Sequence, residues 1–137
     1  MIMKSKITCV TKDGKVVPKY KLEYTHVYEF YCYNEKEQIY HVVCLYEKYI
    51  EHHLNYMLAG KKFLIQEKLD NGTLYMYLRR LDKRMRDLVH SQADRWAKND
   101  KELIEAHNQG DIRKEAGLYN CLINMAEESL YPCVIYV

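Results

Sequence analysis

The residues best suited to chemistry in this sequence form a basic run near its centre. Five positive side chains fall within eight positions, and they are Arg79, Arg80, Lys83, Arg84 and Arg86. Arginine and lysine neutralise phosphates, and spacings of three and four residues place several of them on one stripe of a helix. The run therefore predicts contacts with DNA phosphates. The alternative is a solvated helix face whose charges pair locally, Asp82 with Arg86 and Asp87 with Arg84.

A second charged group lies in the C-terminal part of the chain. Residues 99–137 carry seven acidic and three basic side chains, whereas residues 47–98 carry seven acidic and eleven basic ones. The acidic residues that predict a protein-binding surface are Glu102, Glu105, Asp111, Glu115, Glu127 and Glu128. Such a surface suits the positive groove of a protein that handles nucleic acids. The same asymmetry arises if the acidic end folds onto the basic middle, and the sequence leaves both readings open.

Tyrosine is also unusually frequent, with 14 in 137 residues. Nine of them fall between positions 20 and 56. A tyrosine-rich sheet stacks nucleic-acid bases or offers a rigid surface to a protein partner. The alternative is biased residue usage, with tyrosines simply filling half-buried strand positions.

No template for catalysis or for a metal site is present. None of the three serines lies in a Gly-x-Ser-x-Gly turn, and the chain has no phosphate-binding loop and no His-Glu-x-x-His segment. The histidines and cysteines are dispersed, and their spacing matches no zinc site. We therefore expect a protein that is not an enzyme and that has no catalytic residue, no cofactor and no metal.

The N-terminal elements that position these residues are predicted to be strands. Residues 7–11 and 15–17 flank Asp13-Gly14, and this pair indicates a hairpin because the turn needs a positive φ. Residues 25–33 and 39–46 predict a second strand pair. Pro18 places the residues after it on a sheet edge or outside the ladder, since proline has no N–H to donate.

From residue 47 the apolar spacing becomes helical. It predicts helices over residues 47–60, 63–69 and 73–98, followed by two helices that Asp100 and Asp111 cap. We expect the apolar stripe of the long helix to pack against the final helix or to form a homodimer, and it consists of Leu74, Leu78, Leu81, Met85 and Leu88.

Together these elements predict an α+β fold in which N-terminal antiparallel β-hairpins precede a helical part with one long helix. Residues 1–137 then form a single domain, with strands mainly over 1–46, helices over 47–132 and a terminal strand over 133–137 that joins the sheet. The opening residues lack an apolar signal segment, and no stretch reaches the length of a membrane span. We therefore expect a cytoplasmic protein with no membrane partner.

Two blocks of the chain follow a family pattern. Gly72-Thr73-Leu74, Leu78, Leu81-Asp82 and Met85 have the spacing of a Gly-x-Leu-x-x-x-Leu-x-x-Ile-Asp-x-x-Ala segment. Leu118-Tyr119-Asn120, Ala126-Glu127-Glu128 and Tyr136 are similar to a Leu-Met-Asn, an Ala-Glu-Glu and a terminal Leu-Ile-Tyr. In these blocks the chain resembles the TnpV family of transposon-encoded proteins, small proteins carried on mobile elements of Gram-positive bacteria. The resemblance implies a mobile-element accessory protein and no defined reaction.

These observations lead to two functional hypotheses. The first is a non-catalytic accessory protein of a mobile genetic element that binds DNA or a nucleoprotein complex, with the basic run on phosphates and tyrosines as secondary support. The alternative is a protein-binding module that inhibits or redirects a nucleic-acid-handling protein of the host or of the element. That module would use the acidic residues and exposed tyrosines.

Overall fold

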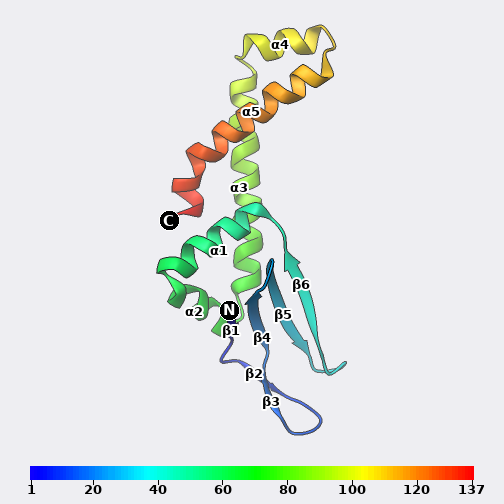
Figure 1. Cartoon of the computed structure of the whole chain (residues 1–137), viewed down its shortest axis with the longest axis vertical. Helices are drawn as coiled ribbons and strands as arrows, with labels where there is room; N and C mark the ends of the chain where they lie inside the picture. Colours follow the sequence, from blue (N-terminus) through cyan, green and yellow to red (C-terminus); the bar gives the residue numbers. More distant parts are fainter. The chain divides into compact units, whose positions relative to one another are not determined.

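The computed structural model describes all 137 residues and divides the chain into two compact units, Met1–Asp82 and Lys83–Val137. The chain has the predicted α+β fold with one long helix (Figure 1). In order, the elements are β1 (Ile2–Lys4), β2 (Thr8–Val10), β3 (Val16–Pro18), β4 (Tyr20–Tyr24), β5 (Tyr28–Asn34), β6 (Ile39–Leu45), α1 (Lys48–Gly60), α2 (Lys62–Asp70), α3 (Leu74–Ala97), α4 (Lys101–Asn108), α5 (Ile112–Leu130) and the π-helical turn η1 (Tyr131–Ile135). No helix combines the length and the apolar composition needed to cross a membrane.

The first unit contains two antiparallel sheets. The four-stranded sheet has the order β1-β4-β5-β6, and β2 pairs with β3 in a separate hairpin. Both predicted strand pairs are confirmed, and Gly14 in the first turn has a φ of +82°. The prediction from Pro18 is wrong, because β4 pairs on both sides. Pro18 is the last residue of β3, so its missing N–H falls outside the β4 ladder.

The core of the first unit lies between one face of the four-stranded sheet and the helices. Strand residues of this face alternate with residues of the opposite face, as the two-residue period of a strand requires. The buried set comprises Met3, Leu22, Tyr28, Phe30, Leu45, Ile50, Leu54, Met57, Ile65, Leu69, Leu74 and Leu78. Gly72 links α2 to α3 with a φ of +73°, and a side-chain carbon there would lie 3.1 Å from the Tyr20 ring. The turn therefore needs glycine.

The second unit consists of the later part of α3 with α4, α5 and η1. Ala93, Leu103 and Leu122 form a buried apolar cluster, against which Trp96 and Leu118 pack. The predicted N-caps are confirmed. The side chain of Asp100 accepts the N–H of Leu103 at 3.1 Å, and that of Asp111 accepts the N–H of Lys114 at 3.2 Å.

The apolar stripe predicted on α3 is wrong at one of its five residues. Leu74 and Leu78, at its start, are buried in the core of the first unit with sheet residues. Further along α3, Leu88 is 36% exposed whereas Val89 is buried. A helix with 3.6 residues per turn drifts away from a strict 3.5-residue repeat, which moves the buried stripe by one position.

The predicted terminal strand does not form. Residues after α5 continue as η1, in which the N–H of Tyr136 bonds the carbonyl of Tyr131 at 2.9 Å. α5 ends just before Pro132, as predicted. Pro132 lies in the first turn of η1, where backbone N–H groups have no partner within the helix, so its missing N–H does not interrupt η1. The segment therefore stays helical. That residues 1–137 fold as a single domain remains a prediction.

Candidate nucleic-acid interface

Arg79, the first residue of the predicted basic run, is held within the first unit. Its Nη1 donates a hydrogen bond to Oε1 of Glu47, and its guanidinium lies 5.1 Å from the ring centroid of Tyr75. The bond to Glu47 raises the pKa of Arg79. The side chain is about one-third exposed. Arg79 therefore connects α3 to the start of α1 and offers little of its charge to a phosphate.

Arg80 is exposed, and no hydrogen bond or ion pair engages its guanidinium. It borders a pocket at the start of α3, which is lined by Lys68, Gly72, Thr73, Met76, Tyr77 and Arg80. Lys68 and Arg80 give this pocket two positive charges and no negative one. Of the predicted basic residues in the first unit, Arg80 is thus the one placed to bind an anion.

Tyr77, which lines this pocket, contacts a buried histidine that the sequence did not reveal. Nε2 of His53 lies 2.6 Å from the Tyr77 hydroxyl, and His53 is 2% exposed. Burial raises the pKa of Tyr77 above its ordinary value. On the solvent side, the Lys68 ammonium lies 4.1 Å from the Tyr77 ring centroid. Tyr77 therefore keeps Lys68 at the pocket beside Arg80.

Lys83, Arg84 and Arg86 belong to the second unit and are all exposed. Lys83 donates to Asp87 at 3.0 Å, so Asp87 pairs with Lys83 and not with Arg84 as the local-pairing alternative supposed. Arg84 makes no ion pair or hydrogen bond. An exposed lysine–carboxylate pair contributes little free energy, so a phosphate can compete with Asp87 for the Lys83 ammonium.

The six acidic residues of the alternative hypothesis do not form one surface. Glu127 is 7% exposed and accepts a hydrogen bond from Tyr131, so it is unsuited to a docking surface. Asp111 caps α5, and Glu115 pairs with His107 at 2.8 Å. Glu102, Glu105 and Glu128 are exposed, but Glu128 lies near the far end of α5 from Glu115. At 1.5 Å per residue that separation is about 20 Å.

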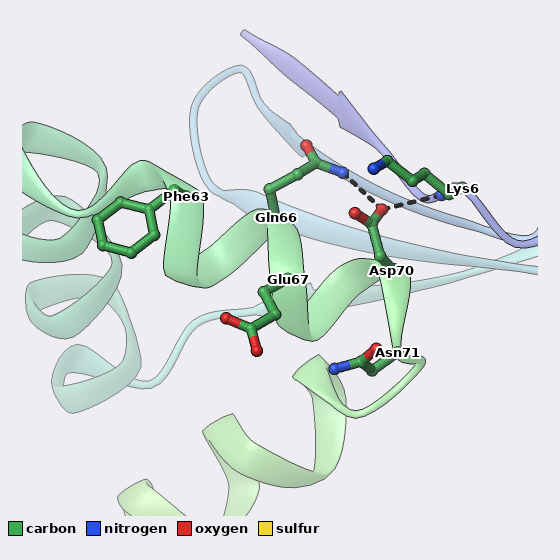
Figure 2. A pocket seen from close by; sticks show the side chains of 6 residues that line it. All are labelled: Lys6, Phe63, Gln66, Glu67, Asp70 and Asn71. Carbon is green, nitrogen blue, oxygen red and sulfur yellow. Dashed lines mark hydrogen bonds between the residues drawn. The ribbon is translucent and has the colours of Figure 1, made fainter.

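A second pocket lies on α2 and is shown in Figure 2. It is lined by Lys6, Phe63, Gln66, Glu67, Asp70 and Asn71. Oδ1 of Asp70 accepts the backbone N–H of Lys6 at 2.9 Å and the amide of Gln66 at 2.8 Å. Gln66 also donates to the carbonyl of Lys4 at 2.7 Å. These bonds fasten the end of β1 to α2, so the polar groups of this pocket serve the fold.

Sequence reasoning missed Lys68, which lies outside the basic run. The predicted short helix contained Lys68 but did not indicate which way its ammonium points. That depends on the Tyr77 ring, which comes from another helix. No three His, Cys, Asp or Glu side chains are arranged to hold a metal ion.

Comparison with known proteins adds no family to this description. The chain matches no protein-family model, no curated protein and no solved structure. The resemblance to the TnpV family therefore stays a prediction.

Proposed function

We propose that this chain is a non-catalytic accessory protein of a mobile genetic element that binds DNA, alone or within a nucleoprotein complex. The observation that carries the proposal is the pair of exposed arginines on α3, Arg80 and Arg84, whose guanidiniums have no partner in the protein. Phosphates are the natural partners of such groups, because the planar guanidinium bonds two phosphate oxygens at once. The resemblance to TnpV proteins supports the mobile element as the genetic setting.

The remaining basic residues have graded roles in this proposal. Lys68 adds a second positive charge beside Arg80, and Lys83 and Arg86 add exposed charges to the second unit. Arg79 stays bonded to Glu47 and serves the fold. Contacts of this kind position the protein on DNA without reading its sequence.

A gel-shift titration with a short duplex tests the proposal. We expect Arg80→Gln combined with Arg84→Gln to weaken duplex binding at least tenfold, because two phosphate contacts and their released counterions are lost. The matched control is Lys12→Gln combined with Arg113→Gln, which removes the same charge from two exposed positions outside the interface. We expect the control to bind more tightly than the double arginine variant.

Two results decide against the proposal. If the wild type does not shift the duplex at low salt, the chain is not a DNA-binding protein, and the protein-binding alternative gains support. If the control loses as much affinity as the arginine variant, binding reflects net charge and not these side chains.

A further inference from the structure

The four-stranded sheet has one covered edge and one open edge. β1 forms the first edge with only three residues, and the Gln66 amide of α2 donates to the carbonyl of Lys4 there at 2.7 Å. β6 forms the other edge with seven residues, which pair with β5 in an unbroken register. Within the first unit, Figure 1 shows no element on the outer side of β6. The open edge is therefore the longer of the two.

The hydrogen bonds of β5 show which backbone groups of β6 point away from the sheet. The N–H of Tyr33 donates to the carbonyl of Lys19 at 2.8 Å, on the β4 side of β5. Backbone groups of successive strand residues alternate in direction, so Cys32 bonds towards β6, where its partner is His41. His41 thus faces β5. The residues of β6 whose N–H and C=O groups point outwards are Tyr40, Val42 and Cys44, and none of these groups has a hydrogen-bond partner.

β6 lacks the features by which sheets usually prevent pairing at an open edge. Such features are charged side chains, prolines and bulges. Residues 39–46 contain no proline and no ionisable acid or base other than His41, which pairs with Glu37 in the preceding turn at 2.8 Å. Apolar side chains are exposed along the edge, with Ile39 at 54% and Val42 at 46%. A row of unpaired N–H and C=O groups is complementary to one kind of ligand, another extended strand.

We propose that β6 pairs with β6 of a second copy of this chain, antiparallel and about a twofold axis at Val42. In this register Val42 lies opposite Val42 of the second copy, and Tyr40 lies opposite Cys44 of the second copy. Each outward N–H then meets an outward C=O, because the three residues are evenly spaced about the axis. The two four-stranded sheets thereby join into one continuous sheet.

The charges of β6 favour a second copy as the occupant. Self-pairing about a twofold axis brings identical side chains close together, so a charged edge strand repels its own copy. From Ile39 to Leu45 the strand has no lysine, arginine, aspartate or glutamate, and the axis passes an uncharged, exposed valine. The edge is therefore complementary to itself both in hydrogen bonding and in charge.

This dimer is distinct from the one that the apolar stripe of α3 predicts. Leu74 and Leu78 of that stripe are buried in the core of the first unit, whereas β6 keeps its outer edge open. The inference also does not depend on DNA binding, since none of the basic residues in the proposed interface lies on β6. Either proposal can fail without the other.

Sedimentation velocity of the full chain over a wide concentration range tests the inference. We expect the wild type to dimerise and Val42→Lys to weaken dimerisation at least tenfold, because two ammonium groups would then meet at the axis. Val42→Thr keeps a branched, uncharged side chain and should dimerise like the wild type. The matched control, Val16→Lys, adds the same charge at an exposed position of β3 and should also dimerise like the wild type.

Amide hydrogen exchange measured by NMR on the wild type locates the contact. The amides of Tyr40, Val42 and Cys44 should exchange quickly in dilute solution and slowly once the dimer forms. Those of His41 and Val43 bond β5 and should exchange slowly at every concentration. Because this measurement needs no variant, it decides the question even if Val42→Lys disturbs the strand.

Three results would overturn the inference. The first is a wild type that stays monomeric at every concentration. The second is a dimer that forms equally well in Val42→Lys and in the wild type, with the sheet intact. The third is exchange at the three outward amides that does not change with concentration, which would place the contact elsewhere.

Discussion

The two units differ in what holds their helices in place. In the first, α1, α2 and the start of α3 pack on a sheet, and side chains such as Leu22, Leu45 and Leu54 are fully buried. In the second, the apolar cluster centres on Ala93, Leu103 and Leu122, and side-chain caps fix the starts of α4 and α5. Both units thus bury large apolar side chains, with Met85, Val89 and Ile135 among those of the second, but side-chain caps start α4 and α5 and are absent from α1 and α2.

The basic residues show a second contrast, which runs within the basic run. Arg79 engages a carboxylate and an aromatic ring, whereas Arg80 of the same unit and Arg84 of the second unit have no partner, so this difference lies between residues and not between units. The neighbours in space therefore decide whether an arginine stabilises the fold, as Arg79 does, or keeps its guanidinium available to a ligand, as Arg84 does. Neighbours in the sequence do not make this distinction, because both arginines belong to one basic run.

The largest expected effect comes from a substitution that creates a cavity in the core of the first unit. Leu22→Ala should lower the free energy of unfolding by about 2–5 kcal/mol, because it removes a fully buried side chain from the sheet–helix core. Hydrogen exchange followed by mass spectrometry measures the loss separately in residues 1–82. Val16→Ala, at a position 66% exposed, is the control and should change stability by less than about 0.5 kcal/mol. Equal protection in Leu22→Ala and wild type would contradict this account of the core.

A smaller effect is expected from the caps of the second unit. Asp100→Ala and Asp111→Ala should each lower stability by about 1 kcal/mol, because each leaves a backbone N–H at a helix start without its side-chain acceptor. Trp96, the only tryptophan, packs on the cluster of this unit and reports its unfolding by fluorescence. Asn120→Ala, on an exposed position of α5, is the control. Unfolding midpoints that do not change in either cap variant would show that the caps add nothing.

The smallest effect concerns alkaline pH and one tyrosine in each unit. Burial raises the pKa of Tyr31 to about 12, with further contributions from the carboxylates of Glu23 and Glu29. Burial likewise raises the pKa of Tyr131 to about 12, with Glu127 adding to it. An unfolded tyrosine ionises near pH 10. The stabilising contribution of both groups is therefore present below about pH 10 and is lost as the pH rises towards 12.

NMR titration of the tyrosine ring carbons checks this prediction residue by residue. Glu29→Gln should lower the pKa of Tyr31 and leave that of Tyr131 unchanged, because Tyr31 bonds Glu29 whereas Tyr131 bonds Glu127. Glu67→Gln, an exposed charge away from both rings, is the control. Ionisation of Tyr31 near pH 10 in the wild type would contradict the assigned environment.

Local signals in the sequence predict much of this fold, and long-range packing explains the errors. Asp13-Gly14, Asp100 and Asp111 locate element ends because their chemistry acts within a few residues. Strand β4 was missed because the prediction extended the effect of Pro18 to the residues after it, whereas Pro18 ends β3 and β4 pairs with both β1 and β5. The stripe on α3 was misplaced because its two ends belong to different units. The basic run was found by composition, but the bond between Arg79 and Glu47 joins residues 32 positions apart.

The salt dependence of duplex binding tests the central claim most directly. If Arg80, Lys83, Arg84 and Arg86 contact phosphates, the logarithm of the binding constant should fall with the logarithm of salt concentration with a slope of about −3 to −4. In the variant that combines Arg80→Gln with Arg84→Gln, the slope should flatten by about two units. Wild-type binding without salt dependence, or an unchanged slope in the variant, would contradict the claim that these side chains bind DNA.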